Sequence, residues 1–171
     1  MYSTQHGCLN SRDKQIKARF CCQGDQKVHG VDYFDTYSPV VSWTKVRILL
    51  ILSLILGLDT KQVDYTCVFL HTLITEDVYV CMSRGFEEEG KVLKLQRSLY
   101  GLRQSPRNFF ECLKENLIKV GFKQSEVDPC LSISEKVICL VYVGDTLFFS
   151  SNESDIDRVL KKLRELKWSW M

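Results

Sequence analysis

Two apolar runs separated by four residues constrain the fold of this chain more than any other feature. The runs cover residues 137–141 and 146–149, and Tyr142-Val143-Gly144-Asp145 lies between them. Short apolar runs on both sides of a glycine-containing turn predict a β-hairpin with Asp145 at its tip. A carboxylate at this place is a candidate functional group, although Gly144 and Asp145 could also serve only the geometry of the turn.

The remaining segments alternate between the two kinds of secondary structure. Strands are expected at residues 17–22, 61–70, 78–82 and 92–95, and the last two should form a hairpin around the acidic turn 87–90. Amphipathic helices are expected from Pro106 to Val120 and, after Ser154 as the cap, from Asp155 to Leu166. Residues 1–16 carry no periodicity and are expected to form a loose lead-in. This order predicts an α+β domain with an antiparallel sheet under helices.

The run from Thr44 to Leu56 is apolar on nearly every side. It is too short for the roughly 20 residues that a membrane-spanning helix needs, so it is expected to be a buried core helix and not an anchor. Gly57 follows at the place where a glycine commonly ends a helix.

Composition excludes several classes of protein. The 171 residues are 45% hydrophobic and 26% charged, which suits one globular domain and argues against disorder or a fibrous repeat. A net charge of +2 does not by itself indicate nucleic-acid binding. The eight cysteines form no C-x-x-C pair, so they are expected to act as small hydrophobic residues. No signal peptide is recognisable, and the cytoplasm or nucleus is therefore the default location.

An ordered set of motifs over about residues 14–168 resembles copia-type retrotransposon reverse transcriptases. The matching segments are Lys17-Ala18-Arg19 with Gly24, the stretch 30–40, Val46-Arg47, Val63-Asp64-Tyr65, Phe69-Leu70-His71, Val78-Tyr79-Val80, Arg84-Gly85-Phe86, the stretch 98–107, Gly121-Phe122, Asp128-Pro129-Cys130 and Tyr142-Val143-Gly144-Asp145. The resemblance implies the fingers and palm of that fold, with an antiparallel palm sheet backed by helices. The fingers would take approximately residues 12–40 and 72–104, and the palm approximately residues 41–71 and 105–171.

The resemblance also implies roles for individual residues. Asp64 and Asp145 would be the catalytic residues and ligands of two Mg²⁺ ions, which in such enzymes promote template-directed addition of deoxynucleotides to a primer. The residues expected to bind the substrates, deoxynucleoside triphosphates and an RNA or DNA primer-template, are Lys17, Arg19, Phe69, Tyr100, Gly101 and Gln104. Each of these residues also has a purely structural interpretation, such as surface charge for Lys17 and Arg19 and core packing for Phe69.

Departures from the family pattern argue against full activity. Gly144 stands where the family has an aspartate that contacts both metal ions, and the chain stops before the expected thumb. We therefore expect an impaired polymerase. No membrane association is expected, because the longest apolar stretch is too short to span a bilayer. The alternatives are a non-catalytic nucleic-acid-binding module and a decayed relic with no selected function.

Overall fold

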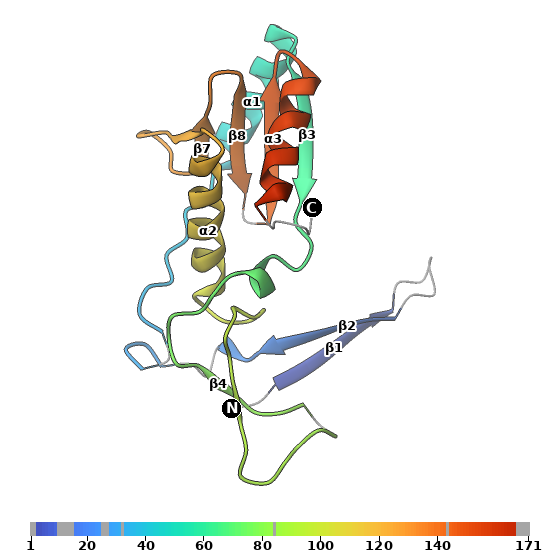
Figure 1. Ribbon diagram of the computed structural model, residues 1–171, viewed down its shortest axis with the longest axis vertical. Helices are drawn as coiled ribbons and strands as arrows, with labels where there is room; N and C mark the ends of the chain where they lie inside the picture. Colours follow the sequence, from blue (N-terminus) through green and yellow to red (C-terminus); the bar gives the residue numbers. More distant parts are fainter. Residues whose placement is uncertain are drawn as a thin grey trace. The chain divides into compact units, whose positions relative to one another are not determined.

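The computed structural model describes residues 3–9, 16–24, 28–31, 33–83, 85–142 and 144–166, with backbone alone for residues 3–9 and 16–19. The chain divides into two units, each built from two separate stretches (Figure 1). The first unit takes residues 1–37 and 69–109, and the second takes residues 38–68 and 110–171. Helices and antiparallel strands are mixed, as expected for an α+β chain.

The second unit contains a five-stranded antiparallel sheet in the order β3-β9-β8-β7-β6. Its strands are β3 (Asp59–Asp64), β6 (Lys123–Gln124), β7 (Leu131–Ile133), β8 (Val137–Tyr142) and β9 (Asp145–Ser150). Tyr142 pairs with Asp145, so the β8–β9 turn has only two residues and the predicted hairpin is confirmed. The short strands β6 and β7 were not predicted.

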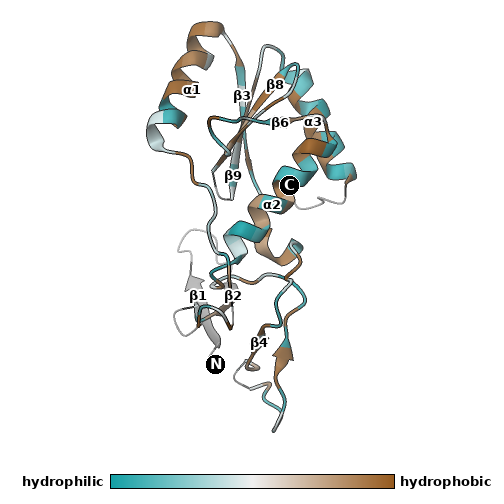
Figure 2. Ribbon diagram, turned by 90° about the vertical axis from the view of Figure 1, so that its left-hand side faces the viewer, coloured by the Kyte–Doolittle hydropathy of each residue, from teal (hydrophilic) through white to brown (hydrophobic). Residues whose placement is uncertain are grey.

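Two helices lie on opposite sides of this sheet, α1 (Trp43–Leu56) and α3 (Glu153–Glu165) (Figures 1 and 2). The apolar stripe of α3 is fully buried at Ile156, Leu160 and Leu163, as its periodicity predicts. Its N-cap is Asn152, whose side chain accepts a hydrogen bond from the Ser154 N–H at 3.0 Å. The prediction that Ser154 is the cap was therefore wrong by two residues.

Helix α1 begins and ends as expected but is not the buried helix that its composition predicted. Ser42 caps its N-terminus, and Gly57, with φ of 62°, ends it in the left-handed conformation. Of its side chains, only Val46 and Ser53 are buried, whereas Leu54 is 83% exposed. The helix is apolar on both sides, yet only one side faces the sheet (Figure 2). The apolar residues on the other side of α1 therefore have no covering surface among the described residues.

The first unit contains two small antiparallel pairs. β1 (Ser3–Leu9) pairs with β2 (Ile16–Cys22), and β4 (Tyr79–Val80) pairs with β5 (Leu93–Lys94). The second pair is the predicted hairpin. The expectation that residues 1–16 form a loose lead-in was wrong, because β1 lies within them and pairs with β2. The hydrogen bonds to β2 can stabilise a strand whose sequence shows no alternation of apolar residues.

Residues 65–71 also differ from the prediction. The strand expected to reach Leu70 ends at Asp64, and the 3₁₀ helix η2 (Val68–His71) follows. Cys67 precedes η2 with a positive φ of 55°, which lies outside the β region that regular strands adopt. This turn ends the strand directly after its aspartate.

Helix α2 (Ser105–Lys119) begins in the first unit and ends in the second. It starts where Ser105 Oγ donates a hydrogen bond to the Leu99 carbonyl at 2.7 Å. Its apolar residues Phe109, Phe110, Leu113 and Leu117 are buried, which confirms the predicted amphipathic helix. None of the helices in the described part of the chain has both the length and the apolarity needed to cross a bilayer.

Candidate functional site

The candidate site lies where β3 ends and β9 begins. Asp64 is the last residue of β3 and pairs directly with Asp145, the first residue of β9. Directly opposed residues of antiparallel strands have Cα atoms about 4.5 to 5.5 Å apart and project side chains to the same face. The structure thus brings together the two carboxylates, which are 81 positions apart in the sequence.

Gly144 is joined to the same place through the backbone. Its carbonyl oxygen accepts a hydrogen bond from the N–H of Tyr65, the residue after Asp64, at 3.3 Å. Its φ is not in the left-handed region, and a Cβ placed on it would have no heavy atom within 4 Å. Position 144 therefore does not require glycine, which argues against the interpretation that Gly144 is there only to shape the turn.

Tyr65 helps to fix this end of β3. Its side chain is only 3% exposed, and burial raises the pKa of its hydroxyl well above the ordinary value. A buried aromatic ring directly after Asp64 holds the strand end in place, while Asp64 itself is exposed.

Three further side chains surround Asp145. Gln62, two residues before Asp64 on the same face of β3, donates from Nε2 to Asp145 Oδ1 at 3.1 Å. Tyr142 lies opposite Asp145 on β8, and the ring of Trp43 from α1 lies against the Tyr142 ring with centroids 5.6 Å apart. The carboxylate is therefore flanked by an amide on one side and by an aromatic pair on the other.

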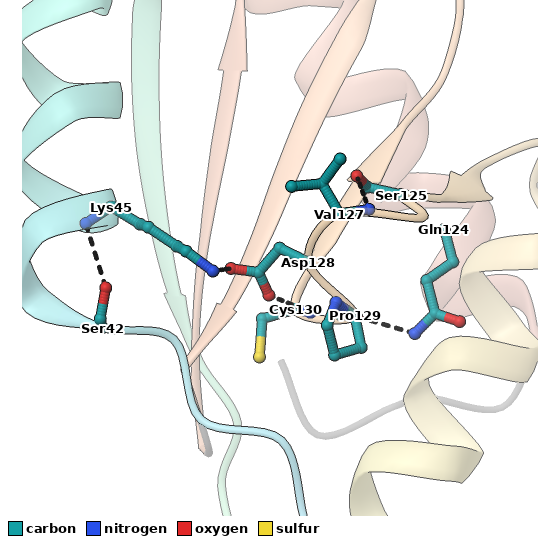
Figure 3. Close-up of polar contacts among 8 residues, drawn as sticks. All are labelled: Ser42, Lys45, Gln124, Ser125, Val127, Asp128, Pro129 and Cys130. Atoms are coloured by element: carbon teal, nitrogen blue, oxygen red, sulfur yellow. Dashed lines mark hydrogen bonds and ion pairs between the residues drawn. The ribbon is translucent and has the colours of Figure 1, made fainter.

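An ion pair fixes the N-terminal turn of α1 near this aromatic pair (Figure 3). Lys45 Nζ lies 2.6 Å from Asp128 Oδ2, while Asp128 Oδ1 accepts the Cys130 N–H at 2.8 Å. Burial alone would raise the pKa of Asp128, but the hydrogen bonds from Lys45 and Cys130 and the lysine charge outweigh it, so the pKa is lowered. Burial, reinforced by the charge of Asp128, raises the pKa of the Cys130 thiol to about 11, so this cysteine is a neutral core group.

The residues expected to bind the nucleotide fall in the first unit. Phe69 and Tyr100 are in edge-to-face contact, with ring centroids 4.9 Å apart. Gly101 has φ of 87°, and a Cβ on it would come within 1.9 Å of the Cys22 carbonyl oxygen. This close approach to β2 gives Gly101 a structural reason to be glycine.

Of the other expected binding residues, Gln104 is buried, and Lys17 and Arg19 belong to β2. Gln104 is 1% exposed, and its carbonyl accepts the Asn108 N–H in the first turn of α2. The backbones of Lys17 and Arg19 pair with Cys8 and His6, whereas their side chains lie outside the described part of the chain. All six expected substrate residues therefore belong to the first unit, and both expected metal ligands belong to the second.

Sequence reasoning missed the neighbours of Asp145. Gln62 could have been found, because strand alternation places residues 62 and 64 on one face. Trp43 and the Lys45–Asp128 pair could not, since nothing in the local sequence indicates which strand or loop a helix will contact.

Two carboxylates meet at this site in the described part of the chain. Two-ion sites for phosphoryl transfer hold cations about 3.5 to 4 Å apart with several shared oxygen ligands. Among the described residues, no group of three or more His, Cys, Asp or Glu side chains is placed to hold a metal ion. Asp64 and Asp145 supply two carboxylates, and position 144 has no side chain to supply a third.

Comparisons with known proteins identify the family. Residues 2–169 match the family model described as reverse transcriptase (RNA-dependent DNA polymerase). The chain is 33% identical over 153 residues to the Retrovirus-related Pol polyprotein from transposon TNT 1-94 of Nicotiana tabacum, covering 85% of this chain and 12% of that protein.

Two further relatives give the same result. The Pol polyprotein from transposon RE1 of Arabidopsis thaliana is 33% identical over 166 residues, which is 93% of this chain and 11% of that protein. The transposon Ty1-MR1 Gag-Pol polyprotein of Saccharomyces cerevisiae is 33% identical over 159 residues, which is 90% of this chain and 9% of that protein.

The chain spans only about a tenth of the length of these polyproteins. No solved structure matches it. The motif order over residues 14–168 and the match over residues 2–169 agree, and the relatives are Pol polyproteins of plant and yeast transposons. The chain belongs to the reverse transcriptase (RNA-dependent DNA polymerase) family, in its copia-type retrotransposon branch.

Proposed function

We propose that this chain is the fingers and palm of a retrotransposon RNA-directed DNA polymerase whose catalytic metal site is incomplete. The first unit would contain most of the fingers and the second most of the palm. The observation that carries the proposal is the direct pairing of Asp64 with Asp145, with the Gly144 carbonyl bonded to the residue after Asp64. Two carboxylates thus meet beside a position that lacks a third.

The proposed consequence is impaired chemistry. Template-directed nucleotide addition needs divalent cations to activate the primer hydroxyl and to stabilise the leaving pyrophosphate. Mg²⁺ requires near-octahedral oxygen coordination, so the loss of one carboxylate weakens its binding and should slow catalysis by roughly 10³-fold or more.

The test is to restore the missing carboxylate. Gly144→Asp should fold normally, because a Cβ at position 144 meets no heavy atom within 4 Å and the backbone there is not left-handed. We expect it to bind Mn²⁺, measured by electron paramagnetic resonance, at least about tenfold more tightly than the chain with Gly144. Ser151→Asp is the matched control, since it adds the same charge at an exposed residue just after β9.

Two results would contradict the proposal. One is equal Mn²⁺ affinity of the parent chain and Gly144→Asp. The other is metal-dependent primer extension by the parent chain at a rate near that of Gly144→Asp. The metal measurement remains informative even if neither form extends a primer, because it needs no template.

Binding of a primer-template and of deoxynucleoside triphosphates is part of the same proposal. Lys and Arg contacts with phosphates do not require the metal site, so nucleic-acid binding can persist without chemistry. The affinity for a primer-template should then fall steeply with salt, in proportion to the number of phosphates contacted. Filter binding at several salt concentrations would measure this slope, and a slope near zero would argue against the proposed partner.

A further inference from the structure

A cavity of about 460 Å³ lies between α1 and the sheet of the second unit. Its walls include Trp43 and Leu50 from the helix and Leu147 from β9, and Gln62 and Asp145 close its polar end. Ligand pockets in proteins typically have 300 to 1,000 Å³ and combine apolar walls with a few polar groups. The size and the lining of this cavity are therefore those of a small-molecule site.

The helix side of the cavity presents large apolar surfaces that the sheet does not cover. Trp43 is 63% exposed and Leu50 is 39% exposed, although both side chains face the sheet across the cavity. An apolar molecule in the cavity would remove this surface from water, which is the main favourable contribution to binding an apolar body.

The polar end of the cavity favours hydrogen-bond donors and positive charge. Gln62 Nε2 is used in its bond to Asp145 Oδ1. Within the described part of the chain, Gln62 Oε1 and Asp145 Oδ2 have no hydrogen-bond partner, and both are acceptors. Asp145 is the one charged residue among the described residues that line the cavity, and Asp64 adds a second carboxylate directly opposite it.

The aromatic pair adds a further preference for a cation. The rings of Trp43 and Tyr142 both line the cavity and lie in contact with each other. Ring faces of Trp and Tyr attract ammonium groups, and they do so more strongly where water is excluded. Lys45, on the same helix as Trp43, does not line the cavity and is paired with Asp128.

We propose that this cavity binds an organic ammonium ion with an apolar, two-ring-sized body. The body lies between Leu50 of α1 and Leu147 of β9, and the ammonium group donates hydrogen bonds to Asp145 and Gln62 beside the Tyr142 ring. This site shares Asp145 with the proposed metal site, but its test does not rest on the proposed polymerase function, because it requires neither metal nor nucleic acid.

The experiment compares three probes with the same ring system on the full 171-residue chain. These are 2-naphthylmethylammonium, neutral 2-naphthylmethanol and anionic 2-naphthoate, titrated by ligand-observed NMR. We expect the ammonium probe to bind at least about tenfold more tightly than the alcohol, and the carboxylate to bind most weakly. Asp145→Asn should reduce the affinity for the ammonium probe to that for the alcohol and leave the alcohol unchanged.

Two tryptophan substitutions on one helix test the location. Leu50→Trp fills the cavity and should weaken the ammonium probe at least about tenfold. Leu54→Trp, one turn further on, makes the same change at a side chain that is 83% exposed and does not line the cavity, so affinity should be unchanged. Circular dichroism would establish that both variants are folded.

A direct measurement of ligand contacts locates the bound probe even if Leu50→Trp fails to fold. Nuclear Overhauser effects should connect the naphthyl protons with methyl groups of Leu50 and Leu147. The proposal is overturned if 2-naphthoate binds as tightly as the ammonium probe, or if the ammonium probe binds without contacts to these two leucines.

Discussion

Lys45 in the first turn of α1 and Asp128 in the loop before β7 form an ion pair of 2.6 Å between residues 83 positions apart (Figure 3). The same loop is held internally, because Gln124 Nε2 donates to the Pro129 carbonyl and the Val127 N–H donates to Ser125 Oγ. The Asp128 side chain is 9% exposed and the Lys45 side chain 49% exposed. The pair therefore connects a helix that buries few of its side chains to a hydrogen-bonded loop between β6 and β7.

Replacing Lys45 should destabilise the chain more than replacing an exposed lysine. Lys45→Met leaves the Asp128 carboxylate buried without its cation, which should cost about 1 to 2 kcal/mol of unfolding free energy. Lys61→Met is the control, since it removes a solvent-exposed pair with Asp157 and should change stability much less than Lys45→Met does. Urea unfolding would measure the change in unfolding free energy for both variants. Equal changes would show that the Lys45–Asp128 pair stabilises the chain no more than an exposed ion pair does.

The same pair predicts how stability depends on pH. The folded-state pKa of Asp128 is lowered, so its contribution is present above the unfolded value of about 3.9 and is lost as the pH falls through the folded value. Unfolding free energy should therefore decrease between about pH 5 and pH 2. In Asp128→Asn this decrease should be smaller than in the parent chain. An identical acid dependence in the variant would show that other carboxylates account for it.

Alanine substitutions at two glycines with positive φ should differ in their effect on stability. Gly90 has φ of 73° and open space around it, whereas Gly101 has φ of 87° and a Cβ would collide with the Cys22 carbonyl. Gly90→Ala should cost about 1 kcal/mol through backbone strain alone. Gly101→Ala should cost at least about 2 kcal/mol more, because the backbone of β2 must move.

This pair of variants also separates two roles of Gly101. A large loss of stability measured by thermal unfolding would assign Gly101 to the packing of the first unit. A stable Gly101→Ala variant with weakened nucleotide binding would instead support the substrate-binding role implied by the family.

Alanine substitutions of leucines on the two helices that flank the sheet should differ sharply in their effect on the free energy of unfolding. Leu163 of α3 is fully buried, so Leu163→Ala should cost about 2 to 5 kcal/mol through lost burial and an internal cavity. Leu54→Ala on α1 removes the same atoms from a side chain that is 83% exposed and should change stability by less than about 0.5 kcal/mol. A large effect at Leu54 would mean that this face of α1 is covered in solution.

The local sequence determined the elements whose signals are local. The hairpin of β8 and β9, the stripes of α2 and α3 and the glycine that ends α1 follow from apolar periodicity and turn chemistry, which act over a few residues. The ordered motifs likewise indicate the family. They also point to Asp64 and Asp145 as candidate site residues without any knowledge of their pairing.

Only the tertiary structure decided what depends on partners distant in the sequence. It paired the first strand with β2, left one side of α1 uncovered, and placed Gln62 and Trp43 around Asp145. It also showed that position 144 has room for a side chain. The physical reason is that burial, ion pairing and free space are properties of two surfaces that meet, whereas a sequence segment encodes only one of them.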